Sequence, residues 1–353
     1  MEHAGQMPCE TRSPPAASTW QHQAHTSVMP SIPLRPPLDH GLRASPPSQS
    51  GKALTAGARE AGRVATRYGG SYTPRMAEFT RDGVTLFYET RGDPETPPVV
   101  LLHGFTMDGR MWLGSIEALA ATFHVIVPDL RGHGRSSAPD DPDAYSMEIY
   151  GEDLRALLDH LEIGISALAG CSFGGMVALQ FATAWPERIA CLVLSDTSPA
   201  YASDRYDDAF RERQRRMLEA EEMVRALGTA ELGRRAARSV KDPFLAEALR
   251  RRYAAMLPEG YLGASRARRE RPDLIPLLRE RLTFPVLLCV GDEDPAGAGT
   301  RVLAEELPAA RVITFRGTGH GVPVIRAEAF TDAVMRFFRE IEEGRFVGGE
   351  RSV

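Results

Sequence analysis

The strongest constraint on the fold is an alternation, from about residue 76 onward, between short apolar runs and longer segments whose apolar residues repeat with helical spacing. The apolar runs, each of strand length, are residues 99–102, 125–127, 167–171, 189–194, 286–290 and 312–315. The segments with helical spacing are residues 147–161, 174–184, 299–307 and 327–341. Strands that alternate with helices predict an α/β fold, in which a mostly parallel sheet is flanked by helices.

The start of this pattern sets the expected N-terminal boundary. Residues 76–89 predict two short strands joined by a turn at Arg81, Asp82 and Gly83, which brings the expected sheet to eight strands. Residues 1–75 are rich in Pro, Ser, Ala, Gly and Gln and are expected to form a disordered leader. Met76 is a candidate for the true start of the protein. A transit peptide is the alternative, against which the prolines and acidic residues of the leader argue.

One stretch interrupts the alternation. Residues 200–280 contain no strand-like run and are rich in Arg, Glu and Ala. They predict a helical insertion that caps an α/β core made of residues 76–199 and 281–345. Most arginines of the insertion are expected on a solvated helix face, with one or two reaching inward to a substrate carboxylate. Those singled out are Arg213, Arg216, Arg234, Arg250, Arg251 and Arg252.

Composition restricts the ligand class and the location. The 353-residue chain carries a formal net charge of −5, which does not suit the phosphate backbone of a nucleic acid. No apolar run reaches the length of a membrane span and no signal peptide is visible, so a cytoplasmic protein without membrane contact is expected. Cys171, Cys191 and Cys289 lie within apolar runs and are expected as core residues without disulfides.

A candidate nucleophile follows the apolar run at residues 167–171. Gly170, Ser172 and Gly174 fit a Gly-x-Ser-x-Gly turn that leads from a strand directly into a helix. Such a sharp turn holds the serine in a strained backbone conformation, and glycines on either side let the neighbouring segments approach. The alternative is a glycine-rich turn in which Ser172 only caps the helix; the flanking strand and helix favour a nucleophile.

Two backbone N–H groups are candidates for an oxyanion hole. The strand at residues 99–102 ends in His103-Gly104-Phe105, and in a parallel sheet this end lies beside the serine turn. The N–H groups of Phe105 and Phe173 are therefore expected to face a substrate oxygen. His103 is expected to brace the loop through side-chain hydrogen bonds, and His133 to order a neighbouring loop.

A serine hydroxyl needs a base, and the base needs an acid that orients it. His320 follows the run at residues 312–315 among small residues, which makes it the candidate base. Asp294 follows the run at residues 286–290 and is the candidate acid. Asp196 also follows a strand and remains the main alternative to Asp294. Asp292 and Glu293 are expected to be structural or solvated carboxylates.

Five ordered motifs resemble those of the α/β-hydrolase fold-1 family, from about residue 76 to residue 343. Within it the chain is similar to 3-oxoadipate enol-lactonases, carbon–carbon bond hydrolases and small esterases. The resemblance implies Asp294 as the acid and Phe105 and Phe173 as oxyanion donors. The motifs are Leu101-Leu102-His103-Gly104-Phe105, Asp129-Leu130-Arg131-Gly132-His133-Gly134, Gly170-Cys171-Ser172-Phe173-Gly174-Gly175, Gly291-Asp292-Glu293-Asp294 and Gly319-His320.

The expected function is a serine-dependent hydrolase with a triad of Ser172, His320 and Asp294. It would act on a small ester, lactone or carbon–carbon (β-diketone-type) substrate through an acyl-enzyme, with no cofactor and no metal. The expected partner is a small-molecule substrate, and a homodimer is possible. Two alternatives remain: a lyase of the menaquinone-pathway type that uses the same triad, and a non-catalytic ligand receptor on the same fold.

Overall fold

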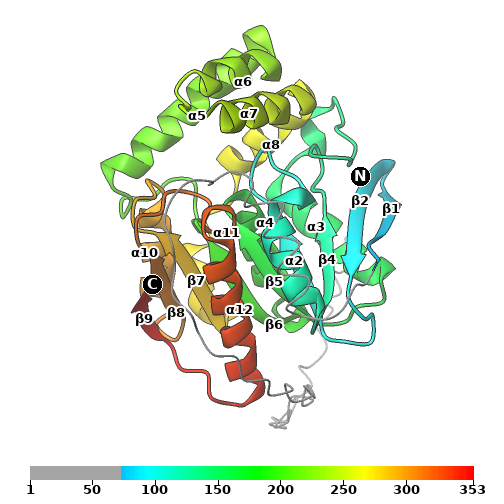
Figure 1. The fold of residues 1–353 in the computed structure, drawn as a ribbon, viewed down its shortest axis with the longest axis vertical. Helices are drawn as coiled ribbons and strands as arrows, with labels where there is room; N and C mark the ends of the chain where they lie inside the picture. Colours follow the sequence, from blue (N-terminus) through cyan, green and yellow to red (C-terminus); the bar gives the residue numbers. More distant parts are fainter. Residues whose placement is uncertain (1–72) are drawn as a thin grey trace, which may run out of the picture. The chain divides into compact units, whose positions relative to one another are not determined.

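The computed structural model describes residues 73–353 (Figure 1). The prediction of a disordered leader, with a transit peptide as its alternative, concerns residues 1–75, of which residues 1–72 lie outside the described residues. Described structure begins with a hairpin of β1 (Arg75–Arg81) and β2 (Val84–Arg91). Asp82 and Gly83 at its tip both have positive φ, 49° and 77°, as a two-residue hairpin turn requires. The predicted turn is thereby confirmed.

Residues 73–353 build one sheet of nine strands in the order β1-β2-β4-β3-β5-β6-β7-β8-β9. β2 is antiparallel to β1 and to β4, whereas the remaining neighbours are parallel. The predicted α/β fold is confirmed. The strands after the hairpin are β3 (Pro98–Leu102), β4 (His124–Pro128), β5 (Ser166–Cys171), β6 (Ile189–Ser195), β7 (Val286–Gly291), β8 (Arg311–Phe315) and β9 (Gly349–Ser352).

The prediction of eight strands was wrong by one, because β9 carries no hydrophobic signal. Its sequence, Gly-Glu-Arg-Ser, is exposed along its whole length. It joins the sheet through backbone pairing with β8, in a register that places Arg311 opposite Gly349. The core therefore extends beyond the predicted limit at residue 345.

Helices cover both faces of the sheet, since alternate residues of each strand enter different hydrophobic clusters. Val100 and Leu102 pack toward α3 and α4, whereas Val99 and Leu101 pack toward α2 and α12. Cys171, Cys191 and Cys289 are buried free thiols in these layers, as predicted. The core helices are α2 (Leu113–Ala120), α3 (Met147–His160), α4 (Phe173–Ala184), α10 (Gly297–Glu306), α11 (Val322–Ile325) and α12 (Ala327–Glu342).

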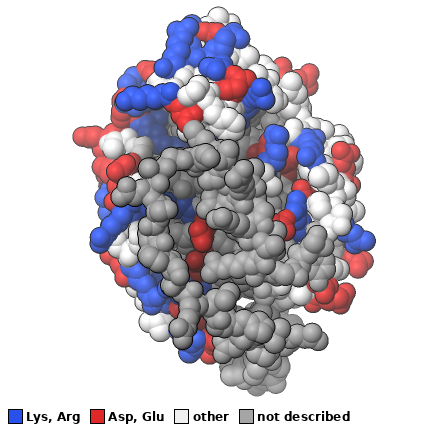
Figure 2. All heavy atoms as spheres, viewed as in Figure 1, with Lys and Arg blue, Asp and Glu red and all other residues white. Residues whose placement is uncertain are grey.

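A helical segment lies between β6 and β7, where the sequence predicts an insertion. Arg and Glu side chains three or four residues apart pair along its outer faces, and charges of both signs are interspersed there in Figure 2. Its helices are α5 (Asp208–Leu227), α6 (Thr229–Ala237), α7 (Pro243–Ala255), α8 (Pro258–Glu270) and α9 (Leu278–Arg281).

The segment is attached to the core through α8. A side chain at Gly260 would collide with the Gly132 carbonyl, and one at Gly263 would collide with the ring of Tyr145. Glu221 of α5 is buried and binds Arg269 of α8 at 2.6 Å. These contacts hold α5 and α8 above the edge of the sheet at which β5, β7 and β8 end (Figure 1). No helix within residues 73–353 has both the length and the apolar character needed to cross a bilayer.

Candidate active site

Ser172 stands on a strained turn between β5 and α4. Its φ of 52° and ψ of −109° fall where a residue with a Cβ atom is rarely found. The flanking glycines make the turn possible: a Cβ atom at Gly170 would lie 2.5 Å from the Gly174 carbonyl oxygen, and one at Gly174 would collide with the Leu102 carbonyl. The predicted strand-turn-helix context is confirmed.

A continuous hydrogen-bonded chain joins three distant loops. His320 Nε2 lies 2.9 Å from Ser172 Oγ, and His320 Nδ1 lies 2.9 Å from Asp294 Oδ2. Because the carboxylate accepts from Nδ1, the neutral imidazole carries its proton there and presents a lone pair at Nε2 toward the hydroxyl. The structure thus brings together the three side chains that the sequence singled out.

Asp294 is placed to remain ionised. It is 8% exposed and its Oδ1 accepts a 2.8 Å hydrogen bond from the backbone N–H of Ala296. Burial by itself favours the protonated acid, but the hydrogen bond and charge of His320 outweigh it and hold the pKa of Asp294 below its ordinary value. A carboxylate in this state fixes the orientation of the imidazole.

Asp196, the alternative acid, supports the histidine loop instead of the imidazole. It is 1% exposed, and its Oδ2 accepts hydrogen bonds from Ser195 Oγ at 2.7 Å and from the N–H groups of Gly321 and Val322 at 3.2 and 2.9 Å. Burial raises the pKa of Asp196. Of the two acids, Asp294 makes the hydrogen bond to the ring, and Asp196 holds the backbone that follows it.

The other two carboxylates of this cluster point elsewhere. Asp292 Oδ1 accepts from the N–H of Thr318 at 3.2 Å, and Glu293 is exposed. Asp292 therefore orders the histidine loop, and Glu293 is solvated, as the sequence analysis expected.

The loop after β3 lies directly against the serine turn. A Cβ atom at Gly104 would be in van der Waals contact with Ser172 Cβ at 3.7 Å, and the rings of Phe105 and Phe173 are 6.0 Å apart. Within the described residues, neither the N–H of Phe105 nor that of Phe173 donates to a protein acceptor. Both groups are therefore available to a substrate oxygen.

His103 holds this loop in place, as predicted. Its Nδ1 lies 2.9 Å from the Gly104 carbonyl oxygen, and its Nε2 accepts a 2.9 Å hydrogen bond from the N–H of Leu130. Burial lowers the pKa of His103, so the ring is neutral and serves one donor and one acceptor. His133 donates from Nδ1 to the Arg131 carbonyl at 3.0 Å, which orders the second loop.

One arginine of the insertion reaches the reactive groups. Arg213 Nη2 lies 3.1 Å from His320 Nε2, although α5 is far from His320 in the sequence. Arg216, Arg234, Arg250 and Arg251 instead pair with glutamates one turn away. Most of these arginines therefore lie on a solvated face, as predicted, and Arg213 points inward. That an inward arginine meets a substrate carboxylate stays a prediction.

The sequence analysis missed two buried arginines of α8 and the loop after it. Arg268 and Arg271 are 3% and 8% exposed. Arg271 donates to the Arg268 carbonyl at 2.6 Å, to Ser198 Oγ at 2.9 Å and to the Ala200 carbonyl, so it ties α8 to the loop after β6. Arg268 has no comparable set of oxygen acceptors.

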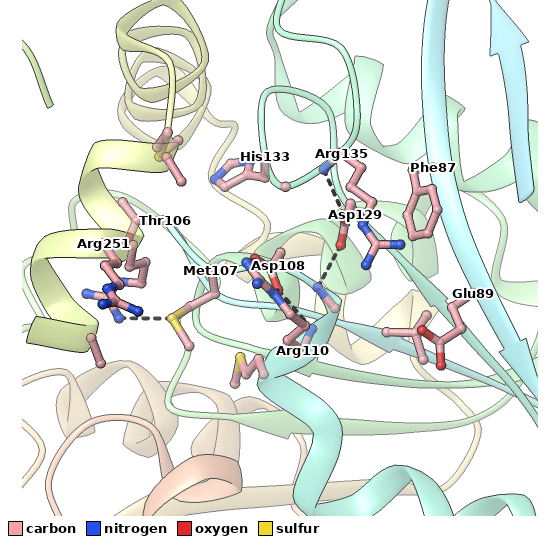
Figure 3. Close-up of a pocket in the computed structure, with 18 of the residues that line it drawn as sticks. Phe87, Glu89, Thr106, Met107, Asp108, Arg110, Asp129, His133, Arg135 and Arg251 are labelled. Atoms are coloured by element: carbon pink, nitrogen blue, oxygen red, sulfur yellow. Dashed lines mark hydrogen bonds and ion pairs between the residues drawn. The ribbon is translucent and has the colours of Figure 1, made fainter. Parts of the chain in front are cut away.

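A cavity of about 650 Å³ lies beside the reactive groups and not over them. Figure 3 shows it between Arg251 of α7 and Phe87 and Glu89 of β2, with Met107 and Asp108 at its centre. Its lining does not include Ser172, Asp294 or His320. This cavity is a neighbour of the loop after β3 and is not the space in which a bond to Ser172 would form.

Comparison with known proteins fits this geometry. Residues 97–325 match the family model for the alpha/beta hydrolase fold. The chain is 30% identical over 223 residues to 3-oxoadipate enol-lactonase 2 of Acinetobacter baylyi, covering 61% of this chain and 78% of that protein. The solved enol-lactonase of Burkholderia xenovorans is 26% identical with a TM-score of 0.66, covering 75% of this chain and 100% of that one. A malate-bound thermophilic esterase of Thermogutta terrifontis is 29% identical with a TM-score of 0.64, covering 77% and 100%.

The protein belongs to the α/β-hydrolase fold family. The resemblance drawn from the motifs is confirmed, and with it the assignment of the chain as an α/β-fold hydrolase.

Proposed function

We propose that Ser172, His320 and Asp294 form the catalytic triad of a serine hydrolase that acts on a small ester, lactone or β-diketone-type substrate. The observation that supports it most directly is the chain of two 2.9 Å hydrogen bonds that ends on a serine with a φ of 52°. The named activities of the similar enol-lactonases and esterase favour an acyl substrate.

The proposed reaction begins when His320 Nε2 accepts the Ser172 proton as Oγ attacks the substrate carbonyl. The N–H groups of Phe105 and Phe173 then donate to the oxygen that gains negative charge. The imidazolium returns its proton to the leaving group as the bond to the carbonyl carbon breaks, which leaves an acyl-enzyme on Ser172. Water, deprotonated by His320, releases the acid and restores the serine. Asp294 stays ionised throughout and stabilises the imidazolium.

The helices between β6 and β7 act as a cap in this proposal. Arg213 of α5 and Tyr261 of α8 contact His320 and Phe105, respectively, so both helices border the reactive groups. Such a cover limits the access of water and shapes the substrate space.

The test is covalent labelling combined with kinetics. A fluorophosphonate should add to Ser172 in the wild type and to no residue in Ser172→Ala, and hydrolysis of p-nitrophenyl esters should fall by about 10⁴-fold or more. Ser166→Ala is the matched control, because Ser166 lies on β5 and its buried Oγ has no hydrogen-bond partner within residues 73–353. This control should label and turn over like the wild type.

Other outcomes separate the remaining alternatives. A lyase that uses the same residues would label with fluorophosphonate, yet mass spectrometry with its substrates would reveal no acyl-enzyme. A ligand receptor would show no turnover of esters, lactones or vinylogous 1,5-diketones, and Ser172→Ala would keep its ligand affinity. Activity that survives in Ser172→Ala would refute the proposal.

A further inference from the structure

Two guanidinium groups from different helices meet at one sulfur atom beside the reactive groups. Arg213 Nη1 lies 3.5 Å from Met217 Sδ, and Arg268 Nη1 lies 3.0 Å from the same atom. A thioether is a weak acceptor and carries no charge to balance two cations. Within residues 73–353, no carboxylate forms an ion pair with either arginine. Asp294 and Asp196 attract Arg213 only from beyond ion-pair distance. Glu221 attracts Arg268 in the same way, but it is already paired with Arg269.

Of the two cations, Arg268 is the one whose burial is more unfavourable. It is 3% exposed, and among the described residues its buried Nε has no hydrogen-bond partner and its only oxygen acceptor is Ser265 Oγ at 3.4 Å. Burial lowers the pKa of Arg268 to about 10, so the group is still charged at neutral pH. A buried cation without a counter-ion is unfavourable, and the planar guanidinium is well suited to bind a carboxylate through two parallel hydrogen bonds.

The position of these groups relates them to the reacting carbonyl. The Arg268 guanidinium lies 6.0 Å from the centre of the Phe105 ring, whose residue is a proposed oxyanion donor, and 5.8 Å from that of Tyr201. Arg213 Nη2 is 3.1 Å from His320 Nε2, which in turn is 2.9 Å from Ser172 Oγ. These contacts place an anion bound by the two guanidinium groups beside the proposed site of bond cleavage.

The contact of Arg213 with His320 also interferes with the triad. Nε2 of a neutral imidazole has one lone pair when the proton is on Nδ1. The Ser172 hydroxyl and the Arg213 N–H both point at that lone pair, so they compete for it. A bond from Arg213 lowers the availability of His320 as the base for Ser172.

We propose that Arg213 and Arg268 bind the carboxylate of an anionic ester or lactone, and that this carboxylate draws Arg213 away from His320. The inference rests on the proposed hydrolase function and specifies its substrate class. Substrate binding then does two things at once: it neutralises the buried cations and leaves Nε2 to the Ser172 hydroxyl. Arg271 takes no part, because both of its Nη groups already donate to Ser198 Oγ and to backbone carbonyls.

A matched pair of substrates tests the charge preference. Mono-p-nitrophenyl glutarate carries a free carboxylate, and methyl p-nitrophenyl glutarate carries the same acyl chain with that group esterified. Wild-type kcat/KM should favour the anion, and Arg268→Met should reduce the anion-to-neutral ratio by about tenfold or more. Arg216→Met is the control, since Arg216 lies on the same helix as Arg213 but pairs with Glu212 at the surface. An equal ratio in the wild type and Arg268→Met would overturn the subsite.

The effect of Arg213 on His320 is measured separately, by the turnover of the neutral ester. Because Arg213→Met removes the competing donor, turnover of the neutral ester should rise by about two- to tenfold, whereas the preference for the anion should fall. A neutral-ester rate that does not rise in Arg213→Met, with the fold retained by melting temperature, would overturn the release of His320.

Binding without turnover separates this inference from the proposed function. In a Ser172→Ala background, glutarate should raise the melting temperature, and the added Arg268→Met change should abolish that shift while Arg216→Met preserves it. If no variant hydrolyses any ester but the Arg268-dependent shift is present, the hydrolase proposal fails and the anion subsite stands. If hydrolysis depends on Ser172 but glutarate gives no Arg268-dependent shift, the subsite fails and the hydrolase stands.

Discussion

His133 shows how burial fixes the charge of a single residue near the site. It is 2% exposed, its Nε2 has no hydrogen-bond partner in the part of the chain that the structure describes, and its ring centre is 5.1 Å from that of His103. Burial, assisted by the neighbouring His103, lowers the pKa of His133 to about 3. The residue is therefore neutral in the folded protein at a pH where an exposed histidine is charged.

This shift predicts a defined loss of stability in acid. Between about pH 6.5 and pH 3 the unfolded chain binds a proton at His133 that the folded chain does not, so the free energy of unfolding falls as the pH falls. The contribution is at most about 1.4 kcal/mol per pH unit. Urea unfolding across this window should therefore show a smaller pH dependence for His133→Asn than for the wild type. Parallel curves for the two proteins would contradict the assignment.

The positions of the proposed triad residues were predictable from the sequence, whereas the buried positions of Arg268 and Arg271 were not. Ser172, His320 and Asp294 each follow an apolar strand, and parallel strands bring such positions to one edge of the sheet. Arg268 has no comparable local mark, and its position depends on how α8 packs on the core.

A partial signal for the inward arginines does exist in the helices. Arg213, Arg252 and Arg268 have no Asp or Glu three or four residues away, whereas Arg216 and Arg234 do. An arginine without such a neighbour gains no ion-pair stabilisation on the helix surface. These three arginines lie inward, where each contacts a methionine sulfur. The choice between an inward and an outward position is still made by tertiary packing.

Among the elements, the turn from β5 to α4 leaves no room for a side chain at Gly170 or Gly174. Gly174→Ala would place a methyl group against the Leu102 carbonyl, and should cost about 2–3 kcal/mol of unfolding free energy. It should also lower kcat, because relief of the collision moves the loop that carries Phe105. Gly164→Ala is the matched control, since a Cβ atom there meets nothing within 4 Å. Equal melting temperatures for the two variants would contradict this account.

Strands with an apolar run were predicted well, whereas a polar strand and a short helix were missed. The predicted run at residues 286–290 became β7 (Val286–Gly291), and that at 189–194 became β6 (Ile189–Ser195). β9 was missed because backbone hydrogen bonds, and not side chains, place it in the sheet. α2 was also missed: Leu113–Ala120 is short, and its helical repeat is too brief to stand out.

For the whole molecule, the C-terminal residues should contribute stability without affecting the chemistry. Phe346 packs edge-on against Phe337 at 5.2 Å, Arg311 Nε donates to the Val347 carbonyl at 3.1 Å, and β9 completes the sheet. Removal of residues 346–353 should lower the free energy of unfolding by about 2–4 kcal/mol. Ester turnover well below the melting temperature should stay within about twofold of the wild type. Residues 346–353 reach Arg316, before the histidine loop, but make no hydrogen bond to Ser172, Asp294 or His320. A large loss of turnover in a folded truncated protein would show that the tail also positions the triad.

The placement of α5 and α8 between β6 and β7 assigns two groups of residues to separate segments of the chain, which can change independently in evolution. The loops that carry Ser172, Asp294 and His320 come from one part, and Arg213 and Arg268 come from the other. Mutation, lengthening or exchange of the segment between β6 and β7 can therefore change which ligand binds, while the residues proposed for bond cleavage stay the same. A change in the length of such a connection has only a small entropic cost. Proteins with this arrangement can therefore diverge in the substrates that they bind and still share one reaction.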